Sequence, residues 1–377
     1  MKFTQQQWTR RRFLSTLTGV GAGVLFSPLS SWANDDIDPK VAAIVAKAMS
    51  IDTHNHIDIP LNAGQSPSPT FDLLGDFKKS GLSAICLTFA VDYQKLENEG
   101  DAYNRFITGL DGIDALLKKN NLTRSMNLKD LTNSFKNKKP AIIQSVEGGH
   151  FLEGKIERLK IAYDRGLRVL GLLHDNDASV PLGDIYTKPP QWNGLTKFGV
   201  EVVKECNKMG IVIDLTHCSN KTIDDALKIS TKPMIVTHTS LDTQLGHNEK
   251  MAQMMKPRLI SKEQAKIVAT AGGVIGAWRH LTDTPLEYVQ NIRALVDVVG
   301  VDNVCIGTDT KISRALENKN PFRLGENTNQ IWQNQENGFF YAVVDSMLKT
   351  GFSEKEIIKI ASGNFCKVFD AATKKTK

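Results

Sequence analysis

Most of the histidines in this chain follow short apolar runs, at the points where strands of a sheet would end. Six of the eight histidines are placed in this way, and acidic residues accompany them. The residues that form the pattern are His54, His56, Glu147, His150, His174, His217, His238 and Asp309. Imidazole and carboxylate groups are typical ligands of zinc and related divalent ions. A single histidine at a strand end is more often a hydrogen-bonded structural residue, but this combination predicts a metal centre.

The spacing of these residues indicates how such a centre would work. His54 and His56 are two residues apart, so on a strand both rings project to the same side and can share one ion. A carboxylate such as Glu147 can bridge two ions, which then share a nucleophilic hydroxide whose pKa falls to about 7. We therefore expect a binuclear hydrolytic site. Three histidines do not belong to this ligand combination and are expected to be structural or to lie at its rim: His150, although it also follows a strand, His247 and His280.

Eight short apolar runs, each long enough for one strand, alternate with stretches of helical periodicity. The predicted strands are Ala48–Thr53, Ser83–Phe89, Ala141–Val146, Arg168–Leu173, Ile211–Thr216, Met234–Thr237, Gly273–Ala277 and Asn303–Gly307. Helices are predicted between them, for example at Leu195–Lys208 and Leu286–Val299. Eight apolar strands separated by helices indicate an α/β fold with a parallel sheet that is covered on both faces.

A closed (β/α)8 TIM barrel is the most economical architecture for eight such units. The C-terminal ends of its strands gather at one mouth, which would bring the polar residues together. A doubly wound open sheet is the alternative, but no Gly-x-Gly-x-x-Gly or phosphate-binding loop follows the first strand. Two long irregular connections, at 175–193 and 309–335, are expected to form lids or walls of the site. Closing helices are predicted at Phe339–Leu348 and Glu354–Ile360.

The composition and charge exclude several classes of protein. With 377 residues, of which 41% are hydrophobic and 23% charged, the chain has ordinary globular composition and enough length for a large core. Of the net charge of +6, four charges come from Lys2 and Arg10–Arg12, in a segment without acidic residues, so the rest carries only +2. A nucleic-acid-binding domain would carry clustered basic residues. The lysines here are scattered, so we expect no nucleic-acid partner.

The first 33 residues have the pattern of an export signal. Arg10–Arg12 precede a short apolar stretch, and Ser31–Ala33 is typical of a cleavage site. The paired arginines before Phe13 resemble a bacterial twin-arginine signal. We expect residues 1–33 to be this signal, recognised by the twin-arginine translocase, and residues 34–377 to be a single periplasmic domain. An uncleaved membrane anchor is the alternative, although the stretch is short and contains several glycines.

Together these residues resemble the membrane (renal) dipeptidase family of zinc peptidases, within the amidohydrolase barrels. The resemblance covers residues 45–370. The segments that carry it are Ile51–Asn55, Ser145–Gly148, Arg168–His174, Asp214–His217, Thr237–Ser240, Ile306–Asp309 and Ser362–Asn364. The chain departs from the family at two places. His56 stands where the family has aspartate, which removes one negative charge from the site, and Thr310-Lys311 replaces the Phe-Asp-Gly that follows the last aspartate.

The resemblance implies a role for each site residue. Two zinc ions would be bound and bridged by Glu147, and their ligands would be His54, His56, Glu147, His217, His238 and Asp309. His174 would bind the substrate and stabilise the oxyanion, and Asp309 would also carry the proton of the attacking water to the leaving amine. Arg258 would bind the free carboxylate of the substrate, the alternative being a solvated loop arginine.

We therefore expect metal-dependent hydrolysis of a dipeptide or a related small amide. One alternative is a non-peptide amidohydrolase such as a lactonase or deacetylase, and another is a non-catalytic barrel. Enzymes of the phosphotriesterase type take their bridging carboxylate from the fourth strand, whereas Glu147 follows the third strand and favours the dipeptidase. The sequence does not determine the oligomeric state, and a homodimer is one candidate.

Overall fold

The strands of the molecule form one parallel sheet. The computed structural model describes residues 37–62, 71–313, 331–332, 335 and 337–374, and the predicted export signal lies outside this part of the chain. Within the described residues the strands are β1 (Ile51–His56), β2 (Ala84–Thr88), β3 (Ala141–Val146), β4 (Leu167–Gly171), β5 (Val212–Asp214), β6 (Ile235–Thr239), β7 (Val274–Ala277), β8 (Val304–Ile306) and β9 (Thr310–Lys311). Their order is β8-β7-β6-β5-β4-β3-β2-β1-β9, and every pair is parallel.

The sheet closes on itself because β9 continues the chain directly from β8 and pairs with β1. Two hydrogen bonds also join β1 to the chain between the end of β8 and the start of β9. The Thr53 hydroxyl donates to the Ile306 carbonyl at 2.9 Å, and the Asp309 amide donates to the His54 carbonyl at 3.0 Å. The closed sheet confirms the predicted (β/α)8 architecture.

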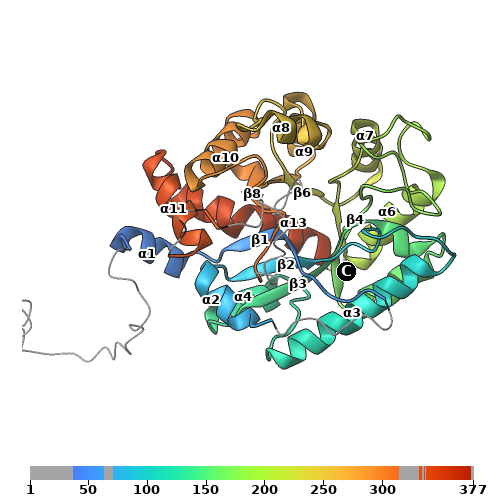
Figure 1. Ribbon diagram of the computed structural model, residues 1–377, viewed down its shortest axis with the longest axis horizontal. Coiled ribbons are helices and arrows are strands. Elements are labelled where there is room, and N and C mark those ends of the chain that lie inside the picture. The colour runs from blue at the N-terminus through green and yellow to red at the C-terminus, as the bar shows by residue number, and fades with distance from the viewer. Residues whose placement is uncertain (1–36, 63–70, 314–330, 333–334, 336, 375–377) are drawn as a thin grey trace, which may run out of the picture. The chain divides into compact units, whose positions relative to one another are not determined.

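Helices connect the strands and surround the sheet (Figure 1). The α-helices of the described residues are α1 (Pro39–Lys47), α2 (Leu73–Ser80), α3 (Asp101–Lys119), α4 (Leu128–Lys136), α5 (Glu157–Asp164), α6 (Lys197–Met209), α7 (Asn220–Ile229), α8 (Glu249–Met255), α9 (Lys262–Thr270), α10 (Pro285–Val299), α11 (Phe339–Lys349), α12 (Glu354–Ile358) and α13 (Asn364–Thr373). Short 3-10 turns add η1 (Gly149–Leu152), η2 (Lys256–Arg258) and η3 (Val301–Asn303), and a π-turn, η5 (Lys359–Gly363), joins α12 to α13. Among these helices we find none that combines the length and apolar character needed to cross a bilayer.

The eight predicted strands are present; β3 has the predicted boundaries, and those of the other seven are shifted. The largest shift is in β1, which was predicted from Ala48 but begins at Ile51 and continues through His56. Ala48 instead caps the C-terminus of α1, its amide donating to the Ile44 carbonyl at 2.8 Å. The apolar residues before Ile51 therefore belong to a helix end, and β1 carries both of its histidines within the strand.

The hydrophobic core closes the barrel at the end where the strands begin. Its members come from most of the strands, from α13 and, at Leu131, from α4, and they include Ile51, Ala84, Ile143, Val169, Val212, Ile235, Phe365 and Phe369. Because α13 covers this end, the C-terminal ends of the strands form the open mouth. All five cysteines are buried and unpaired, which agrees with packing roles for Cys86 and Cys305 in the core.

Candidate metal centre

The ends of six strands bring the predicted ligands, and the predicted substrate-binding residue His174, to one mouth of the barrel. His54 and His56 lie in β1, His238 lies in β6, and the other residues follow the ends of their strands directly or within three residues: Glu147 after β3, His174 after β4, His217 after β5 and Asp309 after β8. The side chains are buried or nearly so, from 1% exposed for His54 to 17% for Asp309. The structure therefore assembles every predicted ligand in one place.

Glu147 lies at the centre of this group. Its Oε1 atom is 2.7 Å from Nε2 of His217, 3.4 Å from Nε2 of His54 and 3.6 Å from Nε2 of His238. Its Oε2 atom is 3.4 Å from Nε2 of His174 and has no hydrogen-bond partner among the described residues, although it is buried. A buried carboxylate oxygen without a hydrogen bond is costly unless a cation compensates for it.

Asp309 is the second carboxylate of the group. Its Oδ1 atom is 3.0 Å from Nε2 of His56, and Nε2 of His56 is 3.2 Å from Nε2 of His54. Zinc–nitrogen distances of about 2.0–2.1 Å place the ligands of a tetrahedral zinc ion about 3.3 Å apart, so these spacings fit such an ion. His280, which the sequence predicts to be structural or to lie at the rim of the site, has its Nε2 atom 2.8 Å from Oδ2 of Asp309.

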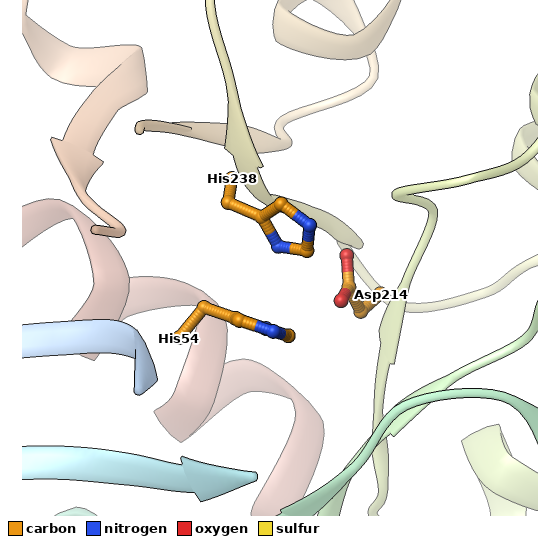
Figure 2. A group of neighbouring side chains, drawn as sticks. All are labelled: His54, Asp214 and His238. Atoms are coloured by element: carbon orange, nitrogen blue, oxygen red, sulfur yellow. The ribbon is translucent and has the colours of Figure 1, made fainter. Parts of the chain in front are cut away.

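The hydrogen bonds on the outer side of the rings explain why the Nε2 atoms face inward. The Thr237 hydroxyl is 3.2 Å from Nδ1 of His54 and 3.0 Å from Nδ1 of His238, and it donates its own proton to Asp214 at 2.6 Å. It can therefore only accept from the two rings, which leaves both Nε2 atoms unprotonated when the rings are neutral. Figure 2 shows His54 and His238 with Asp214 beside them.

Asp214 is close to two histidines but is not a suitable ligand itself. Its Oδ1 atom accepts hydrogen bonds from the amides of Thr216 and Thr237 and from the Thr216 hydroxyl, at 2.9, 3.0 and 2.6 Å. Its Oδ2 atom accepts from Thr237. Since both oxygens are occupied, we assign Asp214 to the outer layer that holds the rings.

The other three rings are held by residues of the loops around the mouth. His217 Nδ1 lies 2.6 Å from the Tyr186 hydroxyl and 3.2 Å from Oδ1 of Asp175. The remaining two contacts join Nδ1 of His174 to Oδ1 of Asp92 at 2.6 Å and Nδ1 of His56 to the hydroxyl of Tyr93 at 3.2 Å. Sequence reasoning missed these partners, because a tyrosine or aspartate in a loop carries no signal of which ring it will contact.

The pKa values show which of the groups can bind a cation. Burial lowers the pKa of His54 and of His238, so both rings are neutral at pH 7. Burial works against ionisation of Glu147, but the surrounding histidines, His174 first, outweigh it and hold the pKa of that carboxyl well below its usual range. The two neutral imidazoles and the ionised carboxylate beside them are donors that suit a zinc ion. The residues therefore fit a divalent metal.

Two site residues have an unfavourable backbone conformation. His217 has φ of +67° and Asp309 has φ of +54°, in the left-handed region that residues other than glycine rarely occupy. Such conformations cost about 1–3 kcal/mol and cluster at functional sites. Both residues lie three positions after the end of a strand, β5 for His217 and β8 for Asp309.

Zinc binding to the metal-free chain should release a proton from His217. Burial disfavours its charged form, but hydrogen bonds to Asp175 and Glu147 outweigh burial and raise the pKa of His217 to about 10. The ring is thus protonated at pH 7 and must lose that proton to bind zinc, so affinity should rise with pH up to about 10. Calorimetric zinc titrations at pH 7.5, in buffers of different ionisation enthalpy, measure this release, and a result of no protons released would contradict it.

Arg258 lies beside this centre, at the end of η2. Its Nη2 atom forms an ion pair with Oδ2 of Asp175, the residue that also contacts His217. The guanidinium carbon lies 5.8 Å from the centre of the Tyr186 ring. Asp175 therefore connects Arg258 to the predicted ligand His217. The other two histidines are not among the five rings: His150 donates from Nε2 to the Asn176 carbonyl at 2.8 Å, and His247 is exposed near Glu287.

Comparison with known proteins places this site in a family. Residues 39–324 match the family described as membrane dipeptidase (peptidase family M19). An uncharacterized dipeptidase of Schizosaccharomyces pombe is 29% identical over 187 residues, which are 46% of this chain and 42% of that protein, so the match spans less than half of that relative.

Two solved structures of the same fold match this chain over nearly their whole length. A probable dipeptidase of Pseudomonas aeruginosa is 15% identical with a TM-score of 0.72, covering 89% of this chain and 98% of that one. A metallopeptidase of Rhodobacter sphaeroides, crystallised with a phosphinate mimic of the dipeptide L-Ala-D-Ala, is 15% identical with a TM-score of 0.66, covering 86% and 99%. At these identities the likeness shows the fold. The family match, over most of the chain, shows that this protein belongs to the membrane dipeptidase family, peptidase family M19.

Proposed function

We propose that this chain is a zinc-dependent dipeptidase. The observation that carries the proposal is the convergence of five imidazole Nε2 atoms on Glu147 and Asp309, with the guanidinium of Arg258 beside them. Family membership supports peptide hydrolysis, and the related metallopeptidase crystallised with a dipeptide mimic supports a dipeptide as the substrate.

Two groups of ligands would hold two zinc ions. His54, His56 and Asp309 would hold one ion, His217 and His238 the other, and Glu147 would be a ligand shared by both. Zinc at these positions supplies Lewis acidity, which polarises the scissile carbonyl and makes a water molecule acidic enough to attack it near neutral pH. The removal of either group of ligands would therefore remove this chemistry.

The remaining steps belong to side chains of the protein. The nearby histidines His238 and His280 outweigh burial and hold the pKa of Asp309 well below its usual range, so its carboxylate is ionised and can accept the proton of the attacking water. Asp309 would then pass this proton to the leaving amine. Burial disfavours the charged form of His174, but Glu147 and Asp92 outweigh it and raise its pKa, so Nε2–H can donate to the developing oxyanion.

A dipeptide panel tests the proposal directly. The purified chain should cleave dipeptides when zinc is added, lose activity after chelation and regain it with zinc, with close to two ions counted per chain. Bound metal without cleavage of any dipeptide would instead favour a non-peptide amidohydrolase. Absence of both metal and cleavage would favour a non-catalytic barrel.

Replacement of Arg258 by alanine should weaken the binding of dipeptides. A guanidinium can hold a carboxylate through two parallel hydrogen bonds, so its loss should raise KM by about tenfold and change kcat less. Steady-state kinetics with one dipeptide measure both constants. The control is Arg165→Ala, whose partners Asp111 and Asp114 lie on α3, apart from the metal centre. Equal KM values for wild type and Arg258→Ala would show that Arg258 does not bind substrate.

We propose further that the protein works in the periplasm after export by the twin-arginine translocase. The support is the sequence alone, in the arginines before Phe13 and the small residues at 31–33. Cell fractionation should find the protein in the periplasm, and replacement of Arg10 and Arg11 by lysine should retain it in the cytoplasm. Periplasmic export of that variant would remove the support for a twin-arginine signal.

A further inference from the structure

Arg258, the arginine proposed to bind the substrate, is already paired with a carboxylate of the protein itself. Arg258 donates from Nη2 to Oδ2 of Asp175, and its Nη1 atom lies 3.4 Å from the Met254 carbonyl. The side chains of Arg258 and Asp175 are 24% and 32% exposed. The pair is therefore largely shielded from solvent. A shielded ion pair is stronger than one at an exposed surface.

Asp175 is held in place by more than this ion pair. Its Oδ1 atom accepts from the Tyr186 hydroxyl and lies near Nδ1 of His217, both at 3.2 Å. One oxygen thus faces a predicted zinc ligand, and the other faces the substrate-binding arginine. Asp175 directly follows His174 in the sequence, so it lies between two parts of the proposed machinery.

Hydrogen bonds within the loop that begins at Asp175, and a bridge to the chain after β5, hold this loop in place. Asp184 accepts hydrogen bonds from the amides of Gln191, Trp192 and Gly194 at 2.7, 3.0 and 2.7 Å. Ile185 pairs with Cys218, the residue after His217. Tyr186, which contacts both Asp175 and His217, is therefore carried by a segment that is fixed to the end of β5.

We propose that Asp175 is a specificity-determining residue, whose carboxylate occupies Arg258 and so reduces the advantage of peptides with a free C-terminal carboxylate over peptides with a neutral C-terminus. This inference rests on the proposed function, because it assigns the substrate preference of the same site. A substrate carboxylate that approaches Arg258 must either displace Asp175 or share the guanidinium with it. Both arrangements place two negative charges near one positive charge, whereas a neutral C-terminus meets no such repulsion.

The test compares one dipeptide, alanyl-alanine, with its C-terminal amide. In the Asp175→Asn variant, an amide of the same shape still offers Oδ1 to Tyr186 and His217 but no longer carries the charge that neutralises Arg258. The ratio of kcat/KM for the free acid to that for the amide should rise about tenfold, the size expected for one nearby charge. Any effect on the metal centre is common to both peptides and cancels in this ratio.

Two further variants separate charge from structure. Tyr186→Phe removes a hydrogen bond from both Asp175 and His217 without changing any charge, so the ratio should stay within about twofold of the wild type. In the Arg258→Ala background, Asp175→Asn should no longer raise the ratio towards the free acid, because the freed guanidinium is absent.

In parallel, calorimetry measures the binding of the two peptides to the metal-free chains, where no turnover occurs.

The outcomes distinguish this inference from the proposed function. A rise in the ratio in Asp175→Asn but not in Tyr186→Phe supports the role of Asp175. An unchanged ratio, or an equal rise in both variants, overturns it while leaving the dipeptidase intact. If neither peptide is cleaved, the proposed function fails, and a shift of binding towards the free acid in Asp175→Asn still supports the inference. Absence of any such shift, or of any binding, then overturns it.

Discussion

Replacement of Glu147 by glutamine should lower kcat/KM for dipeptides by about a thousandfold or more and remove at least one of the two zinc ions. The change keeps the volume of the side chain but removes its charge and makes one of its atoms a donor. That carboxylate has His217, His54 and His238 on one oxygen and His174 on the other. An amide nitrogen at either position cannot bind a cation. Metal analysis and steady-state kinetics on the same sample measure the two effects.

A matched control for this experiment is Glu153→Gln. The side chain of Glu153 is also buried, at 5% exposed, and it accepts hydrogen bonds from Arg158 at 2.6 Å and from the Gly100 amide at 3.0 Å. Loss of that charge tests whether any buried carboxylate at this end of the barrel is needed for folding. The assignment of Glu147 as the bridging ligand is wrong if Glu147→Gln binds two zinc ions and turns over at the rate of the control.

The barrel could be predicted because its signal is local. Each strand is a short apolar run, and six of the eight end in polar residues that a barrel must place at its mouth. The boundaries were less predictable where apolar residues continue from a helix into a strand. Ala48 shows this, because nothing in its sequence neighbourhood distinguishes the last turn of α1 from the first residues of β1.

The outer layer of the metal centre could not be predicted in the same way. Thr237 contacts His54 across a separation of 183 residues, and Asp92 contacts His174 across 82 residues. Patterns of hydrophobicity report which residues are buried but not which partner each polar atom finds. For the same reason the contact of His280 with Asp309 could not be predicted, although His280 was expected to be structural or to lie at the rim.

The close approach of the strands around Thr237 shows that its position is fixed by packing. A Cβ atom at Gly276 would lie 1.9 Å from the Thr237 carbonyl oxygen, and one at Gly307 would lie 1.7 Å from it. Only glycine leaves room for that oxygen at both places. The hydroxyl of Thr237 is thereby held between Asp214 on one side and the rings of His54 and His238 on the other.

Replacement of Thr237 by valine should therefore weaken zinc binding by about 10- to 100-fold, the usual effect of losing an outer partner of a metal ligand. Valine keeps the shape but removes the single acceptor that fixes Nδ1–H on two rings, so each ring is free to adopt the tautomer that protonates Nε2. Zinc affinity is measured by competition with a chelator.

The control is Thr53→Val, because the Thr53 hydroxyl is also buried and donates to the Thr237 and Ile306 carbonyls at 2.9 Å but contacts no ring. Both variants lose buried hydrogen bonds and should lose stability, but only Thr237→Val should lose zinc affinity. An equal loss of affinity in both would mean that the barrel, and not the orientation of the two histidines, sets the strength of the metal centre.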